Sequence, residues 1–247
     1  MKIINMTMEV KERQVIGVLV AQDYRTASIF KSFGIDFCCK GNRTIKEVCE
    51  TANIESALLI ESLEKVINSQ ENLNTDYQSW PLDLLADYIE KKHHRYVEEK
   101  TKEIQSYLNK VCQVHGVHHP ELFEIKDHFN ATASELLMHM KKEELILFPF
   151  VRKMVKIKNE GLKVDIPPFG TVQNPVQMMM HEHEAEGDRF RRIAELSNNY
   201  TAPQDACNTY KVTFALLKEF ENDLHLHIHL ENNILFPKAI ELENHLI

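Results

Sequence analysis

The chain has 247 residues and carries 29 Lys and Arg against 37 Asp and Glu, a formal net charge of −8. This balance excludes a non-specific nucleic-acid binder, because binding to the phosphate backbone needs a basic surface. The longest apolar run covers seven residues, 15–21, whereas a membrane helix needs roughly 20. The first residues also lack the apolar stretch and cleavage site of a signal peptide. We therefore expect a cytoplasmic protein with no nucleic-acid or membrane partner.

Short helical patterns broken by turns are typical of residues 1–70. Apolar residues at helical spacing predict four short helices there, and Thr44 with Glu47 forms a capping box at the start of the third. The polar run that follows has no periodicity and predicts a linker. We therefore expect a small helical domain over 1–70, followed by a linker over 71–80.

Long helical periodicity begins after Trp80. It predicts four long helices, with short connections within the first pair and within the second pair, which is the pattern of an antiparallel four-helix bundle over 81–247. Alternation with a period of two is missing throughout, so we assign the chain to the all-α class. The four helices are expected at 82–113, 120–156, 173–198 and 204–242.

The pattern H-x3-E-x2-I-L-F-P occurs twice in the expected bundle. It begins at His139 and again at His227, 88 residues later, and places Glu143 and Glu231 four residues after these histidines. Residues i and i+4 share one face of a helix, so each pair is able to bind one metal ion, and each carboxylate is able to bridge two. The repeat predicts a bundle built from two equivalent helical hairpins.

These metal-binding positions fall on the apolar faces of their helices. His139 and Glu143 share the apolar seam of the second long helix, which also includes Ile146, and His227 with Glu231 shares that of the fourth. A buried carboxylate is costly unless it is paired or metal-bound. The pattern therefore favours a metal site in the core over exposed ion pairs.

The first and third long helices each add one histidine to this core face. His94 lies on the seam of the first helix, whereas His93 lies about 100° from it. His183 lies on the seam of the third helix, whereas His181 does not. The histidine spacing within the two hairpins is nearly equal, 45 and 44 residues. The predicted ligands of a two-metal site are His94, His139, Glu143, His183, His227 and Glu231.

Imidazole and carboxylate ligands in a helical bundle suit a di-iron or di-manganese centre better than zinc. An oxo or hydroxo bridge would make each ion five-coordinate and leave room for a small ligand such as oxygen or nitric oxide. His115, in the first hairpin loop, is a candidate for a position near the metals.

Adjacent Cys38 and Cys39 lie in the segment 34–42, ahead of the bundle. This segment together with the repeated HxxxE helices resembles the iron–sulfur cluster repair di-iron proteins (repair of iron centres), which carry a hemerythrin-like domain. The resemblance implies two iron ions in an oxo- or hydroxo-bridged di-iron centre, held by the six residues above, with a further family histidine near the metals at His115. It also implies repair of iron–sulfur clusters damaged by oxidative or nitrosative stress, by supply of iron, with the damaged iron–sulfur proteins as partners.

Other functions would use the same site. One is reversible binding or sensing of oxygen or nitric oxide, and another is reduction of nitric oxide, so whether the chain is an enzyme stays open. Cys38 and Cys39 cannot form an unstrained disulfide with each other. Redox activity, transient metal binding, contact with a partner and simple packing at a turn all remain alternatives for them. The oligomeric state is also open, with a homodimer as one alternative.

Overall fold

The computed structural model describes residues 9–69, 75–163 and 166–246. Within these ranges the regular structure is helical, apart from one isolated antiparallel bridge between Val15 and Thr44. The expected all-α class is therefore confirmed.

The chain divides into two compact units. The first contains residues 1–80 together with 229–237, and the second contains 81–228 together with 238–247. The helical periodicity predicts one bundle over the whole of 81–247, so it does not indicate the grouping of 229–237 with the first unit.

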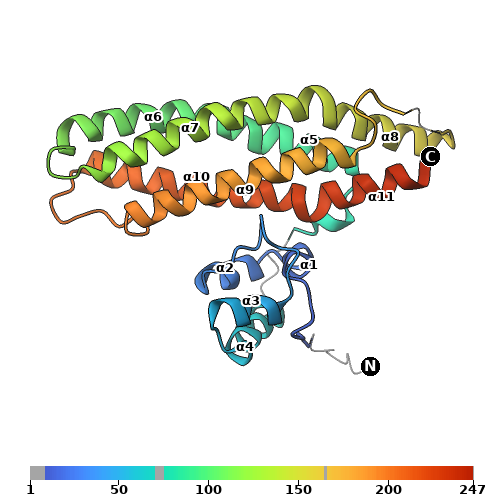
Figure 1. Ribbon diagram of the computed structural model, residues 1–247, viewed down its shortest axis with the longest axis horizontal. Coiled ribbons are helices and arrows are strands. Elements are labelled where there is room, and N and C mark those ends of the chain that lie inside the picture. Colours follow the sequence, from blue (N-terminus) through green and yellow to red (C-terminus); the bar gives the residue numbers. More distant parts are fainter. Residues whose placement is uncertain (1–8, 70–74, 164–165, 247) are drawn as a thin grey trace. The chain divides into compact units, whose positions relative to one another are not determined.

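Short amphipathic helices form the first unit (Figure 1). The predicted capping box is present at α3, where Thr44 Oγ1 accepts a hydrogen bond from the Glu47 backbone N–H at 3.3 Å and the Glu47 carboxylate accepts one from the Thr44 N–H at 2.7 Å. Residues 71–74 of the expected linker lie outside the described residues. The helices are α1 (Ile16–Gln22), α2 (Thr26–Ser32), α3 (Ile45–Ala52), α4 (Ser56–Ile67) and the 3₁₀ turn η1 (Tyr77–Ser79).

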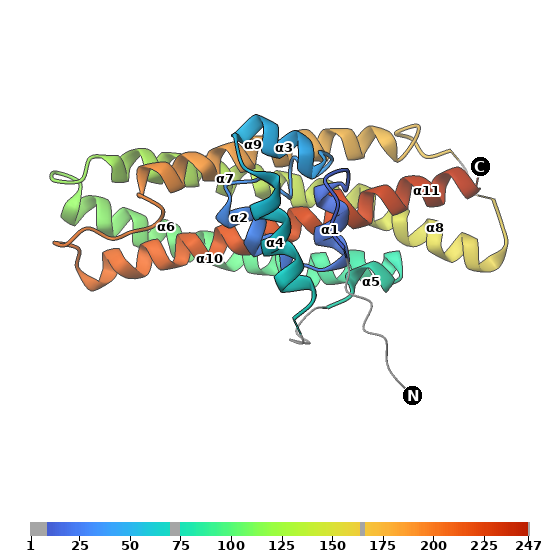
Figure 2. The same ribbon diagram turned by 90° about the horizontal axis from the view of Figure 1, so that it is seen from below.

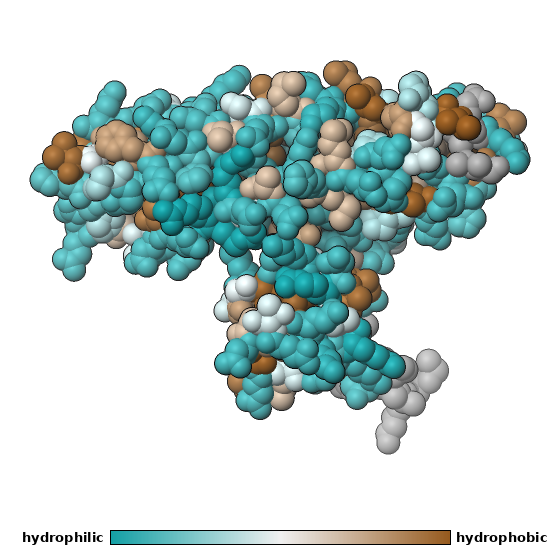
Figure 3. Space-filling view, in the orientation of Figure 1, coloured by the Kyte–Doolittle hydropathy of each residue, from teal (hydrophilic) through white to brown (hydrophobic). Residues whose placement is uncertain are grey.

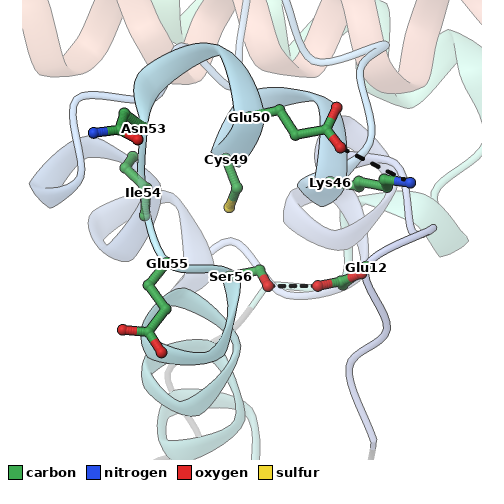
Figure 4. Close-up of a pocket in the computed structure, with 8 residues that line it drawn as sticks. All are labelled: Glu12, Lys46, Cys49, Glu50, Asn53, Ile54, Glu55 and Ser56. Carbon is green, nitrogen blue, oxygen red and sulfur yellow. Dashed lines mark hydrogen bonds and ion pairs between the residues drawn. The ribbon is translucent and has the colours of Figure 1, made fainter.

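A polar pocket of about 490 Å³ lies beside α3 and the start of α4 in the first unit. Figure 4 shows the Cys49 side chain directed from α3 into it, with a Lys46–Glu50 ion pair and a Ser56–Glu12 hydrogen bond on its walls. Burial raises the pKa of the Cys49 thiol above its usual value. None of the metal-binding groups found among the described residues includes a residue of this pocket.

Four long helical rods run side by side in the bundle (Figures 1 and 2). The five-residue connection 116–120 favours antiparallel packing of the first two rods, whereas the connection 197–207 between the last two is longer than the sequence pattern predicts. The rods consist of α5 (Leu82–Tyr88), η2 (Ile89–His94) and α6 (Arg95–His115); α7 (Glu121–Lys142), η3 (Glu143–Leu147) and α8 (Phe148–Glu160); α9 (Gln173–Leu196); and α10 (Asn208–Leu230), η4 (Glu231–Leu235) and α11 (Phe236–Leu246).

Three of the rods are interrupted by π-helical turns, each at a predicted metal ligand. The turn η2 ends at His94, η3 begins at Glu143 and η4 begins at Glu231. The turns η3 and η4 occupy equivalent positions of the 88-residue repeat. Single π turns within α-helices are frequent at functional sites, and the 3.6-residue periodicity of the sequence did not predict them.

Aromatic rings contact one another in the core of the second unit. The rings of Phe190 and Phe220 are stacked with centroids 5.7 Å apart, and Phe129 meets Phe220 edge-on at 5.3 Å. Hydrophilic residues cover most of the visible face of the bundle (Figure 3). In the described part of the chain, no helix is both long enough and apolar enough to cross a membrane.

The two repeat copies differ in the burial of their shared isoleucine. Ile234 in η4 is 1% exposed, and η4 contacts α1 within the first unit. Ile146 in η3 is 47% exposed, so its predicted position on the apolar seam is wrong. Both isoleucines lie in equivalent π turns, so the difference in burial follows from the neighbours of each turn, and α1 is a neighbour of η4.

Candidate metal centre

The structure brings the six predicted ligands together in two overlapping groups. In each group the candidate ligand atoms all lie within 4.8 Å of one another. Glu143 and Glu231 belong to both groups, which is the arrangement of two metal ions that share bridging carboxylates. The groups are His94, Glu143, His227 and Glu231, and His139, Glu143, His183 and Glu231.

All six side chains are at most 3% exposed. The His139 and His183 Nε2 atoms lie 3.0 Å apart, and Glu143 Oε2 lies 3.4 Å from the Nε2 atoms of both His94 and His139. Two carboxylates in an apolar core need compensating positive charge, and nitrogen and oxygen donors of this kind are those that iron and manganese accept. The residues present therefore fit a pair of divalent cations.

Two further carboxylates orient the histidines of the first hairpin. His94 Nδ1 lies 3.0 Å from Glu144 Oε1, and His139 Nδ1 lies 2.8 Å from Glu182 Oε2. An ionised carboxylate only accepts hydrogen bonds, so these contacts place the ring proton on Nδ1 and leave the Nε2 lone pair for a metal. Such outer carboxylates fix the tautomer and raise the basicity of a ligating histidine.

The charges around these carboxylates keep them ionised. The hydrogen bond from His139 lowers the pKa of Glu182 to about 2, and Lys142 adds to the effect. Burial acts to raise the pKa of Glu144, but hydrogen bonds from Lys141 and His94 outweigh it and lower the pKa. Both carboxylates therefore remain acceptors at neutral pH.

His93 is fully buried, although the regular helical spacing places it about 100° from the apolar seam. Its Nδ1 lies 3.1 Å from both carboxylate oxygens of Asp223, and its ring stacks on that of His227 with centroids 5.6 Å apart. The wider π turn η2 turns two successive histidines inward, which a regular α-helix with 100° between neighbours would not do.

The second hairpin lacks the counterpart of Glu144. The equivalent residue 88 positions later is Asn232, and its side-chain amide donates a hydrogen bond to the Cys38 carbonyl oxygen at 3.1 Å. The turn η4, which belongs to the first unit, thus contacts the cysteine loop within that unit.

His115 lies at the other end of its rod. It is the last residue of α6, a helix of 21 residues that begins directly after His94, and such a helix is about 31 Å long. Its Nε2 lies 3.2 Å from the Sγ atom of Cys207. The expectation that His115 lies near the metals is therefore corrected.

Sequence reasoning missed the residues that support the histidines. Glu144 and Glu182 each lie next to a predicted ligand in the sequence. The histidines that they contact, however, are 50 and 43 residues away. Asp223 precedes His227 by four residues, yet its partner His93 is 130 residues away. Only the packing of the rods decides these pairs.

The fold and the paired His/Glu groups define a cation-binding helical bundle. Residues 85–239 match the family described as the hemerythrin HHE cation binding domain, and residues 12–67 match ScdA_N, a domain of unknown function. The chain is 30% identical over 230 residues to the iron-sulfur cluster repair protein ScdA of Staphylococcus haemolyticus, covering 93% of this chain and 99% of that protein. It is 31% identical over 230 residues to the iron-sulfur cluster repair protein YtfE of Yersinia pestis, covering 93% of this chain and 98% of that protein.

The hemerythrin match spans more than half of the chain, and the relatives are matched over nearly their whole length. The chain therefore belongs to the ScdA/YtfE family of proteins with a hemerythrin HHE domain.

Proposed function

We propose that this protein repairs iron–sulfur clusters damaged by oxidative or nitrosative stress, and that it does so in the cytoplasm by supplying iron from a di-iron centre. The observation that carries the proposal is the pair of overlapping His/Glu groups with two shared glutamates. The near full-length similarity to proteins named for iron–sulfur cluster repair supports the same function.

The residues divide into three roles in this proposal. Glu143 and Glu231 would be shared by two iron ions. His94 and His227 would complete the ligands of one ion, and His139 and His183 those of the other, as the two groups suggest. Glu144 and Glu182 hold the Nδ1 protons of their histidines and so keep Nε2 directed at the ions. When bound, the iron pair supplies releasable ferrous iron and the ability to change oxidation state.

The donor set favours transfer of iron toward a damaged cluster. All six proposed ligands provide nitrogen or oxygen, whereas iron–sulfur clusters are held by cysteine thiolates and sulfide, which are softer donors. Damaged iron–sulfur proteins are therefore the proposed partners, and the iron that leaves is the cargo of the reaction.

Reactivation of a damaged [4Fe–4S] dehydratase tests this function. The enzyme is inactivated with peroxide or nitric oxide and then incubated with the iron-loaded protein, in the presence of a chelator that traps free iron. We expect its activity to return with wild-type protein and not with the iron-depleted Glu231→Ala variant. Equal recovery from the same amount of free ferrous iron without the protein would contradict the proposal.

The alternative functions give different outcomes in the same assay. A carrier or sensor of oxygen or nitric oxide would change its absorption spectrum with the gas but restore no dehydratase activity. A nitric oxide reductase would consume nitric oxide over many turnovers when given a reductant. Either result without reactivation would replace iron supply as the function.

A further inference from the structure

A second group of metal-binding side chains lies in the first unit, in the loop between α2 and α3. It consists of Asp36, Cys38 and Cys39, whose candidate ligand atoms all lie within 4.8 Å of one another. Cys38 is buried, whereas Asp36 and Cys39 are half-buried. The loop therefore offers two sulfur atoms and one oxygen, with one side open to solvent.

The distances within this group match those across a tetrahedral metal ion. Two thiolates bound at about 2.3 Å to one tetrahedral ion lie about 3.8 Å apart, and a thiolate and a carboxylate oxygen lie about 3.6 Å apart. The Sγ atoms of Cys38 and Cys39 are 3.7 Å apart, and Cys38 Sγ is 3.5 Å from Asp36 Oδ1. Two of the three donor separations therefore already match those of a bound ion, and the third pair lies within 4.8 Å.

The backbone of the loop is fixed before any ion binds. Asp36 Oδ1 accepts hydrogen bonds from the backbone N–H groups of Cys38 at 3.2 Å and Cys39 at 2.9 Å. The carbonyl oxygens of Phe37 and Cys38 accept from the side-chain amides of Asn233 at 3.3 Å and Asn232 at 3.1 Å. Such preorganisation lowers the entropic cost of closing a metal site.

A glycine allows the loop to close against η4. A Cβ atom on Gly41 would lie 2.4 Å from the Phe37 carbonyl oxygen and 3.0 Å from Asn233 Oδ1. The Gly41 carbonyl oxygen also accepts a 2.7 Å hydrogen bond from the Gly17 N–H. Position 41 therefore requires glycine for the cysteines to be held where they are.

We propose that Asp36, Cys38 and Cys39 form a second metal site, separate from the paired His/Glu groups, and that its ligand is a divalent transition-metal ion. Binding releases one proton from each of the two thiols, so that two thiolates and one carboxylate hold the ion and a fourth position stays open. The open position and the half-buried ligands suit an ion that exchanges. The assignment of this ion as ferrous iron rests on the proposed function, whereas the existence of the metal site does not depend on it.

Cobalt(II) is a probe that distinguishes metal binding at this site from metal binding at the His/Glu groups. The six residues of the paired His/Glu groups contain no sulfur, so a thiolate-to-cobalt charge-transfer band reports on the cysteines alone. Cobalt chloride is titrated anaerobically into the reduced, iron-loaded, full-length protein. We expect about one equivalent of cobalt to bind with this band, as one tetrahedral site predicts. A folded wild-type protein that gives no such band would overturn the proposal.

Two variants and a matched control test the assignment of ligands. Cys39→Ser, at the half-buried cysteine, should lose most of the band. Asp36→Asn keeps an amide oxygen that accepts the loop N–H groups, and because it replaces a charged carboxylate ligand with a neutral amide it should weaken cobalt binding by about ten-fold or more. Cys207→Ser removes an exposed thiol elsewhere and should leave the titration unchanged. An unchanged band in Cys39→Ser, with the helical circular dichroism of the wild type, would refute the site.

Competition between ferrous iron and cobalt identifies the natural ion of the site. It also keeps the second metal site distinguishable from the proposed function. Ferrous iron binds more weakly than cobalt to a given site, so about a ten- to hundred-fold excess should displace the cobalt band. Failure of displacement at that excess would overturn iron as the ligand. Because the cobalt titration needs no dehydratase, a negative reactivation assay with a positive cobalt band would reject the proposed function and leave the second metal site standing.

Discussion

Cys207 is the side chain whose chemistry is most clearly set by its neighbours. It lies at the N-terminus of α10, and the backbone N–H groups of Tyr210 and Thr209, together with His115, lower the pKa of its thiol to about 7. Helix N-termini and histidine stabilise a thiolate in this way. About half of Cys207 should therefore be ionised at pH 7, against a few per cent of an ordinary thiol.

The pH dependence of iodoacetamide alkylation measures this effect. His115→Ala should raise the Cys207 pKa toward that of an ordinary thiol and slow alkylation at pH 7 about five-fold, with little change above pH 9. Cys49, whose pKa is raised by burial, is the internal control and should react slowly in the native state. Identical rate profiles for wild type and His115→Ala would show that His115 does not act on the thiol.

The six proposed ligands should contribute unequally to iron content. Glu143 and Glu231 belong to both His/Glu groups, whereas His94 belongs to one. Glu143→Ala or Glu231→Ala should therefore lower the occupancy of both irons, and His94→Ala should mainly lower one. Iron per folded chain, measured by elemental analysis, gives the answer. Loss of both irons from His94→Ala and retention of both in Glu143→Ala would reverse the assigned roles.

At the scale of single elements, α3 depends on its capping box. Thr44→Ala removes the hydroxyl that accepts the Glu47 N–H, and loss of an N-cap of this kind costs about 1 kcal/mol. Hydrogen exchange of α3 amides should accelerate accordingly. Thr51→Ala, the same change at an exposed position within α3, should have a smaller effect because alanine is a better helix former than threonine. Equal acceleration in the two variants would contradict the role of the cap.

At the scale of the whole molecule, the proposed irons hold the buried His/Glu groups together. Removal of iron by a chelator should leave two carboxylates in the core without their cations, so the bundle should lose stability by the free energy of iron binding. Hydrogen exchange measured by mass spectrometry should show reduced protection around Glu143 and His183, with α3 and α4 little changed. The same protection with and without iron would exclude a structural role for the metals.

Local sequence patterns were sufficient to predict the all-α class, the long helices and the two related hairpins. These features depend on spacing along one helix, and residues three, four and seven positions apart share a face wherever the helix lies. The same rule predicted that His139 lies beside Glu143, and His227 beside Glu231. The structure places each pair within one of the two His/Glu groups. The capping box at Thr44 was equally local, because its two hydrogen bonds join residues three apart.

The residues that support these groups follow from tertiary packing, which local patterns do not predict. A π turn changes the angular phase within a helix, and for this reason His93 is buried against the periodicity. Ile146 is exposed and the equivalent Ile234 is buried although both lie in π turns, and α1 contacts η4. Contacts such as His115 with Cys207, 92 residues apart, or Asn232 with Cys38, 194 residues apart, depend on where packed helices place their side chains. No local spacing encodes such distances, because the free energy that selects them comes from burial and close packing of the folded chain.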